Sequence, residues 1–146
     1  VTEPEATFSA CFGAAFLTLH PTKYADLLQE KLENHGSNAY LVNTGWSGGK
    51  YGEGERMSIK ETRACIDAVL SGDILQSEFR KDELFGFDVP IELPGVSKEV
   101  CNPRESWKYP TAYDEQANKL AKMFKENYKQ YTGENVTDYT KFGPKV

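Results

Sequence analysis

The sequence predicts an α/β or α+β fold, in which helices cover a sheet that is incomplete within this chain. Helical and strand-like hydrophobic patterns alternate along the 146 residues, which is typical of layered folds of these classes. The strand-like segments are too few to form a closed sheet. No internal repeat, low-complexity tract or long linker interrupts the chain, so we expect one unit over residues 1–146 with no internal boundary.

The N-terminal third predicts a buried segment followed by a helix. Residues 7–19 are apolar nearly all round, so we expect a larger sheet to bury them on every side, and poor protection without it. A helix is predicted over residues 21–34, because Pro21 suits a first turn and Gly36 suits a helix end. The residues at helical spacing are Tyr24, Leu27, Leu28 and Leu32.

The middle of the chain predicts a strand, a loop and a well-defined helix. The short apolar run of residues 39–42 is typical of a buried strand that leads into a functional loop. Ser58 and Glu61 match the capping box, which predicts a helix up to Ser71, ended by Gly72. Its inner face should carry Thr62, Ile66, Val69 and Leu70.

The C-terminal half predicts a half-buried strand, a loop and a covering helix. Alternation over residues 85–91 indicates the strand, and Pro90 places it at a sheet edge or a strand end. Residues 94–110 resemble a loop. A helix is predicted over residues 111–132, ended by Gly133. Its apolar face carries Ala117, Leu120, Ala121, Phe124 and Tyr128.

Composition and charge exclude several classes of partner. The chain is 39% hydrophobic and 27% charged, as globular proteins are. Its net charge is −5 with no basic stripe, so we expect no nucleic-acid partner.

The sequence shows no membrane span, because no run approaches the roughly 18 apolar residues that one needs. The acidic start is unlike a signal peptide, and three cysteines form no disulfide framework, so we expect a cytoplasmic protein. The start without methionine indicates a truncated chain.

A glycine-rich loop over residues 45–54 lies between a predicted strand and a predicted helix, where phosphate-binding loops occur. A P-loop needs Gly, four residues, Gly-Lys and then Ser or Thr. Gly45 and the Gly49-Lys50 pair are one residue too close, and Tyr51 replaces the hydroxyl residue. A flexible surface loop therefore explains these residues better than a phosphate cradle.

The histidines and cysteines do not predict a metal site or a nucleophile. His20 and His35 lie at opposite ends of a predicted helix about 20 Å long, so they cannot share one ion. Cys11 and Cys65 have apolar surroundings and no basic neighbour, which favours structural cysteines.

The entry to the capped helix offers the best candidate for binding. Arg56 supplies a guanidinium plane, Met57 a soft apolar side chain, and Thr62 a hydroxyl further along. Together these groups can hold a flat heterocycle. From the residues alone, a solvated arginine ahead of a helix is the alternative interpretation.

Several stretches of the sequence carry a family resemblance. They are Thr2-Glu3-Pro4, Thr7-Phe8-Ser9-Ala10-Cys11-Phe12-Gly13-Ala14-Ala15-Phe16, His20-Pro21-Thr22, Tyr40-Leu41-Val42-Asn43-Thr44-Gly45-Trp46, Ser58-Ile59-Lys60-Glu61-Thr62-Arg63, Pro90-Ile91-Glu92-Leu93-Pro94-Gly95-Val96 and Gly143-Pro144-Lys145-Val146. From end to end the chain resembles the C-terminal portion of ATP-dependent phosphoenolpyruvate carboxykinases. The resemblance implies the C-terminal segment of the mononucleotide-binding domain of a larger enzyme.

The family resemblance implies a lyase of gluconeogenesis that converts oxaloacetate and ATP into phosphoenolpyruvate, ADP and CO₂. Decarboxylation gives an enolate that attacks the γ-phosphoryl group, with Mg²⁺ on the nucleotide and Mn²⁺ near the substrate. In this family the P-loop, the metal ligands and the substrate arginines lie upstream of the portion that this chain resembles. We therefore expect no catalytic residue and no metal ligand in this chain, and no activity from it alone.

The same resemblance assigns the adenine-side contacts to Arg56, Met57 and Thr62. Met57 stands where family members often have isoleucine, and the loop over residues 48–55 is longer than in many bacterial members. The family includes monomers and homo-oligomers, and the sequence does not distinguish them. The alternative hypothesis is an independent small binding or scaffold domain of the same ancestry.

Overall fold

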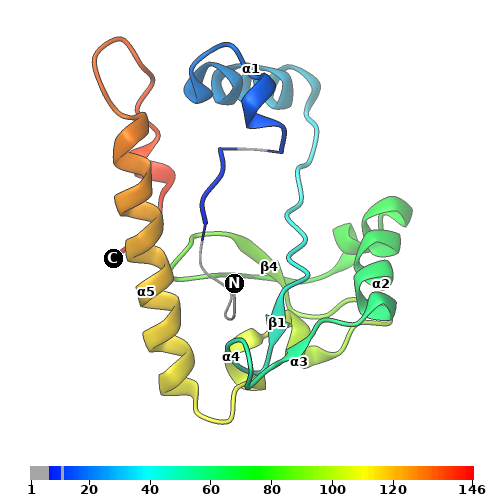
Figure 1. The fold of residues 1–146 in the computed structure, drawn as a ribbon. Coiled ribbons are helices and arrows are strands. Elements are labelled where there is room, and N and C mark those ends of the chain that lie inside the picture. The colour runs from blue at the N-terminus through cyan, green and yellow to red at the C-terminus, as the bar shows by residue number, and fades with distance from the viewer. Residues whose placement is uncertain (1–6, 11) are drawn as a thin grey trace.

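The structure is a computed structural model that describes residues 7–10 and 12–146 (Figure 1). The described part is a mixed fold with separate helices and two small antiparallel sheets. The helices are α1 (Pro21–His35), α2 (Ile59–Ser71), α3 (Lys98–Cys101), α4 (Pro103–Ser106) and α5 (Pro110–Tyr128). The strands are β1 (Trp46–Ser47), β2 (Glu55–Arg56), β3 (Phe79–Lys81) and β4 (Asp88–Pro90). Short 3-10 helices occupy Ala14–Phe16, Asp73–Gln76, Lys129–Tyr131 and Thr140–Phe142.

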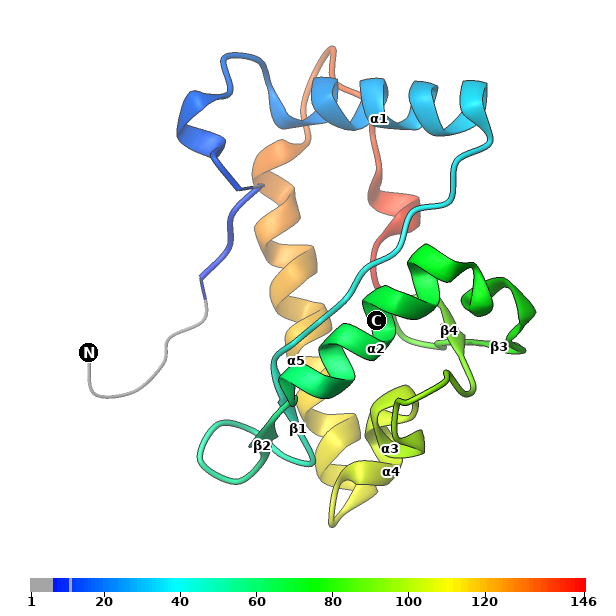
Figure 2. The same cartoon turned by 90° about the vertical axis from the view of Figure 1, so that its right-hand side faces the viewer.

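The helices surround the two sheets on different sides. In Figure 1, α5 runs along one side, α2 lies on the other, and both sheets lie between them. The short helices α3 and α4 lie at the lower end, and α1 lies across the upper end. Residues 37–44 connect α1 to β1 as one long segment that belongs to no helix or strand (Figure 2).

The predicted first helix is confirmed as α1. Pro21 occupies its first turn, and the ring Nδ1 of the preceding His20 accepts the amide of Thr22 at 3.4 Å. Gly36 ends the helix with φ of 60°, a left-handed conformation that glycine adopts without a steric penalty. The two histidines therefore flank α1 at opposite ends, as the sequence predicts.

The predicted capped helix is confirmed as α2, but its capping differs in detail. Ser58 accepts the amide of Glu61 at 3.1 Å, which is one half of a capping box. The Glu61 carboxylate accepts the Ser58 hydroxyl at 2.9 Å. Gly72 ends the helix with φ of 85°. The helix therefore begins and ends where the sequence predicts.

The prediction for the inner face of α2 is right for Thr62 and Val69, which are half-buried, and wrong for Ile66 and Leu70. The buried residue of α2 is Ala68, and Cys65 and Val69 pack beside it. Ile66 is 42% exposed and Leu70 is 79% exposed, so the larger apolar side chains point away from the small core. That core contains Ala68, Ile74, Leu93 and Cys101, with Tyr40, Cys65, Val69 and Val96 packed against it.

The predicted strand over residues 85–91 is shorter in the structure. It is reduced to β4, which pairs with β3, a strand that the sequence patterns did not indicate. The Asp82 carboxylate accepts the amides of Leu84 and Phe85, so these residues form the turn of a hairpin. Pro90 is the last residue of β4, as predicted for a residue without an amide hydrogen.

The predicted strand over residues 39–42 is not formed. These residues are in neither a helix nor a strand, and Leu41 is 82% exposed. A strand needs a neighbour to satisfy its backbone groups, and neither two-stranded sheet of the described residues supplies one at this place.

Residues 7–19 are likewise not buried in the part that the structure describes. Phe12 and Phe16 are fully or almost fully exposed, at 106% and 88%. Residues 1–6 and Cys11 lie outside the described residues, so the expectation for Cys11 has no counterpart there. The exposure of the two phenylalanines matches the poor protection expected of this run without a larger sheet.

The C-terminal region differs from prediction only in its loop. Residues 94–110 contain the short helices α3 and α4, where the sequence indicated no helix. The predicted covering helix is α5, continued by the 3-10 helix Lys129–Tyr131. Ala121 is completely buried on its predicted face, whereas Leu120 and Phe124 remain 39% and 44% exposed. Part of the apolar face of α5 is therefore not packed against the described residues.

Candidate nucleotide-binding site

The glycine-rich loop is the tip of a small hairpin. Strand β1 pairs with β2, with Trp46 opposite Arg56. A Cβ atom at Gly54 would lie 2.5 Å from the carbonyl oxygen of Gly49, so the two sides approach too closely for another residue. The Lys50 carbonyl accepts the amide of Gly54 at 2.9 Å. The loop thus closes on itself and does not have the open form of a phosphate cradle, in agreement with its spacing.

The three residues predicted to bind a nucleotide lie at the beginning of α2. Arg56 is exposed at the end of β2, and its guanidinium has no hydrogen-bond or ion-pair partner among the described residues. Met57 is half-buried, and its amide donates to the Gly45 carbonyl at 3.0 Å. Thr62 is half-buried in the first turns of α2. The hairpin and the helix cap therefore bring these residues to one end of α2.

The hydroxyl of Thr62 has a defined hydrogen-bonding role. Its Oγ1 donates to the Ser58 carbonyl oxygen at 3.0 Å. A hydroxyl has one hydrogen to donate and two lone pairs that accept. With its hydrogen used inside the helix, the Thr62 oxygen can accept a hydrogen bond from an amine of a ligand.

Trp46 is an aromatic residue of this region that sequence reasoning did not select. Residues directly opposite in an antiparallel pair face the same side, so Trp46 and Arg56 share one face of the hairpin. Trp46 is 48% exposed, and its ring meets that of Tyr51 edge-on, with centroids 5.2 Å apart. Reading residues 45–56 as a hairpin with glycines at its turn would have revealed this pairing.

A network around Glu61 links α2 to the loop before α3. Its carboxylate accepts the Ser97 hydroxyl at 2.7 Å and the Ser58 hydroxyl at 2.9 Å. These bonds, that from Ser97 first, lower the pKa of Glu61 below its ordinary value. Glu61 therefore stays ionised at neutral pH, in the first turn where a negative charge favours the helix.

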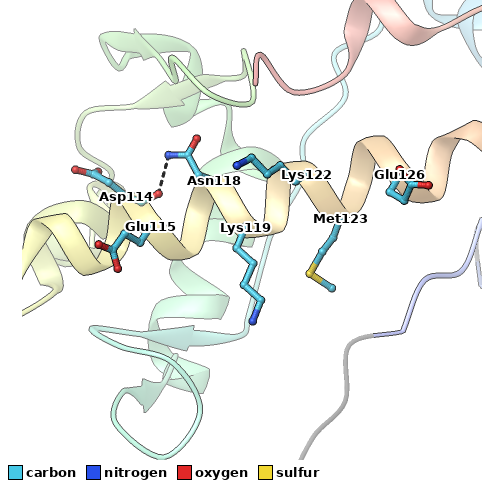
Figure 3. A pocket seen from close by; sticks show the side chains of 7 residues that line it. All are labelled: Asp114, Glu115, Asn118, Lys119, Lys122, Met123 and Glu126. Atoms are coloured by element: carbon cyan, nitrogen blue, oxygen red, sulfur yellow. Dashed lines mark hydrogen bonds between the residues drawn. The ribbon is translucent and has the colours of Figure 1, made fainter.

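Two hollows that residues of the described part line both lie elsewhere. The larger, of ≈ 740 Å³, is an open groove lined only by α5 residues (Figure 3). Its charges are mixed, and a dashed line marks the Asn118 amide donating to the Asp114 carbonyl at 2.8 Å. The smaller, of ≈ 280 Å³, lies between the hairpin loop and α5, beside Lys50 and Trp107. Neither hollow is lined by Arg56, Met57 or Thr62.

The described residues contain no group of three His, Cys, Asp or Glu side chains that could hold a metal ion. They therefore do not fit a Mg²⁺ or Mn²⁺ site. Cys65 and Cys101 are free thiols, and burial raises the pKa of both. A raised pKa lowers the thiolate fraction, which supports a structural role for these two cysteines.

In the described part of the chain, no helix combines the length and apolar character that a membrane crossing requires.

Comparison with known proteins identifies the family. A family model described as phosphoenolpyruvate carboxykinase matches residues 1–99. Over the whole chain, the sequence is 53% identical to phosphoenolpyruvate carboxykinase (ATP) of Sulfurimonas denitrificans and 51% identical to that of Thermus thermophilus. It is 56% identical to the protein of the same name from Campylobacter lari. The chain spans 28% of the length of each of these relatives. The chain therefore belongs to the ATP-dependent phosphoenolpyruvate carboxykinase family.

Proposed function

We propose that this chain is the C-terminal segment of the nucleotide-binding domain of an ATP-dependent phosphoenolpyruvate carboxykinase, and that it supplies the adenine-side contacts to ATP. The parent enzyme would convert oxaloacetate and ATP into phosphoenolpyruvate, ADP and CO₂. The observation that carries this proposal is the similarity over the entire chain to proteins of which it spans only 28%. At 51–53% identity over its whole length, this chain is expected to adopt the fold of the corresponding segment of its relatives and to have the same role in the enzyme.

The beginning of α2 suits the adenine role. The unpartnered, exposed guanidinium of Arg56 can lie flat on a heterocycle, and the apolar side chain of Met57 can cover the base. The Thr62 oxygen can accept a hydrogen bond from the adenine amino group. An exposed Trp46 on the Arg56 face adds an aromatic surface beside the site.

Catalysis requires groups that we place outside this chain. Phosphoryl transfer depends on metal ions and on donors that position the phosphates. The described residues offer neither a metal-ligand cluster nor an open phosphate loop. We therefore assign to this chain the binding of the base, far from the phosphoryl group that is transferred.

Steady-state kinetics of the full-length enzyme test the site assignment. Contacts to the base are nearly equal in the ground state and the transition state, so their loss should raise KM and leave kcat largely unchanged. A stacked arginine contributes roughly 0.5–2 kcal/mol and a neutral hydrogen bond about 0.5–1.5 kcal/mol. Arg56→Ala and Thr62→Val should therefore each raise the KM for ATP roughly 2- to 30-fold.

Arg56→Lys separates stacking from charge, because lysine keeps the charge and loses the plane. We expect it to behave like Arg56→Ala, with the KM for oxaloacetate unchanged in both. Arg63→Ala, which removes an exposed arginine of α2, is the matched control. An unchanged KM for ATP in Arg56→Ala, with an unchanged melting temperature, would refute the assignment.

A further inference from the structure

We propose that Ser97 is a positioning residue for nucleotide binding, which acts through Glu61 to hold the beginning of α2 in its binding orientation. The inference rests on the proposed role of Arg56, Met57 and Thr62. It adds a residue that lies 35 positions after Thr62 in the sequence and belongs to a different element.

A continuous set of hydrogen bonds connects Ser97 to the site. The Ser97 hydroxyl donates to Glu61 Oε1 at 2.7 Å, and the Ser58 hydroxyl donates to Glu61 Oε2 at 2.9 Å. The Ser58 carbonyl oxygen in turn accepts the Thr62 hydroxyl at 3.0 Å. Both oxygens of one carboxylate are thus used, one toward a distant loop and one toward the helix cap.

Ser97 does not use its hydroxyl for its own helix. It stands at the N-cap of α3, where serine usually accepts an amide of the first turn. No such side-chain bond is formed, and the hydroxyl is directed to Glu61 instead. Ser97 thus forms a hydrogen bond to α2 and no side-chain capping bond to α3.

The loop that carries Ser97 is held firmly against α2. Gly95 adopts φ of 75°, and a Cβ atom there would lie 3.3 Å from the Cβ of Ala64. Val96 packs against the small core that contains Ala68 of α2. Because the loop is fixed at these points, the Ser97 bond can fix the orientation of Glu61 and of the helix turn that contains Thr62.

The electrostatics of Glu61 agree with this role. The Ser97 bond is the largest cause that lowers its pKa, so the contact favours the charged carboxylate. A hydrogen bond to a charged acceptor is stronger than one between neutral groups. The contact therefore favours an ionised Glu61 that keeps both hydrogen bonds, although Ser97 is exposed and Glu61 only half-buried.

The test is kinetic and uses the full-length enzyme. Ser97→Ala should raise the KM for ATP about two- to fivefold, with kcat and the KM for oxaloacetate unchanged. Ser97→Thr keeps the hydroxyl and should restore the wild-type KM. Ser77→Ala is the matched control, because the Ser77 hydroxyl donates to the Glu92 carbonyl at 3.0 Å and takes no part in this network.

A double-mutant cycle with Glu61→Ala tests the route of action. If Ser97 acts through Glu61, the double variant should be no weaker for ATP than Glu61→Ala alone. Additive effects of the two changes would overturn the proposal.

Arg56→Ala, measured in the same series, separates the two proposals. If it raises the KM for ATP while Ser97→Ala matches Ser77→Ala, the role of Ser97 is refuted and the nucleotide assignment stands. If neither Arg56→Ala nor Ser97→Ala changes that KM, both are refuted.

Discussion

Tyr139 and Asp26 form the contact that ties the C-terminal region to α1. The Tyr139 hydroxyl donates to Asp26 Oδ1 at 2.7 Å, across 113 positions of sequence. This bond raises the pKa of Tyr139 to about 12 and lowers the pKa of Asp26. The Tyr139 amide also donates to the hydroxyl of Tyr128 on α5, at 2.8 Å. Tyr139 therefore connects α1 and α5, which are distant in the sequence.

The pH dependence of this contact follows from the two shifts. The Tyr139 pKa is raised on folding, so its contribution is complete below the ordinary pKa of 10 and is lost as the pH rises through about 12. The Asp26 pKa is lowered, so its contribution is present above 3.8 and is lost as the pH falls through the folded value. The contact should thus hold throughout the neutral range.

NMR of tyrosine labelled at Cζ tests the Tyr139 contact, with Tyr139→Phe identifying the signal. We expect a pKa near 12 for Tyr139 in the wild-type protein, moving toward 10 in Asp26→Asn. Tyr109, which is 61% exposed and lies outside this contact, is the internal control, and its signal should be the same in both proteins. A pKa near 10 for Tyr139 in the wild type would show that the bond to Asp26 is absent in solution.

At the level of elements, the three long helices were predictable, whereas of the predicted strands only part of residues 85–91 formed, as β4. The ends of α1 and α2 depend on local signals such as Pro21, Ser58 and Gly72, which act within a few residues. The strand over residues 39–42 depends on a distant partner, and its local pattern cannot supply one. The inner face of α2 was mispredicted at Ile66 and Leu70 for the same reason, because burying these exposed side chains also requires distant partners.

In the candidate site, too, the residues that lie close together in the sequence were predicted, and those that lie farther away were not. Arg56, Met57 and Thr62 are close in sequence, and a helix cap sufficed to place them together. Ser97 reaches Glu61 from 36 positions away, and Trp46 is brought opposite Arg56 by strand pairing. No local pattern marks a contact over 36 positions, so sequence reasoning missed Ser97. The pairing of Trp46 was missed because residues 45–56 were not read as a hairpin with glycines at its turn.

Residues 39–42 form no strand in this chain, and we predict a different state for them in the full-length enzyme. In the full-length enzyme we expect them to form a strand, because their apolar side chains and extended backbone then gain partners. Hydrogen exchange should be slow at alternate amides of this run in the full-length protein and fast in the 146-residue chain. The amides of α2 serve as control and should be protected in both. Fast exchange over residues 39–42 in both proteins would contradict the prediction.

The whole molecule exposes far more surface than a compact domain of its size. A monomeric protein of 16.4 kDa is expected to expose about 7,500 Å², whereas this chain exposes 11322 Å². The excess includes large apolar side chains such as Phe12, Phe16, Leu41 and Leu70. Large apolar side chains that are exposed in this number favour a surface that other parts of a protein cover, which argues against an independent scaffold domain.

The isolated chain should therefore behave as an incomplete protein. We expect it to bind hydrophobic dyes, to associate at moderate concentration, and to form no phosphoenolpyruvate from oxaloacetate and ATP with Mg²⁺ and Mn²⁺. Dye fluorescence, light scattering and a coupled assay measure these three properties. A monodisperse chain that melts cooperatively, or one that shows metal-dependent turnover, would count against this expectation.

The mass of the native polypeptide tests most directly whether this chain is one segment of a longer carboxykinase. An alignment of 147 residues covers 28% of the relatives, which corresponds to about 525 residues, or about 59 kDa at the mean residue mass of this chain. An antibody raised against α5 should detect a native band near that mass, and phosphoenolpyruvate-forming activity should co-purify with the band. A native product of 16.4 kDa would contradict the account.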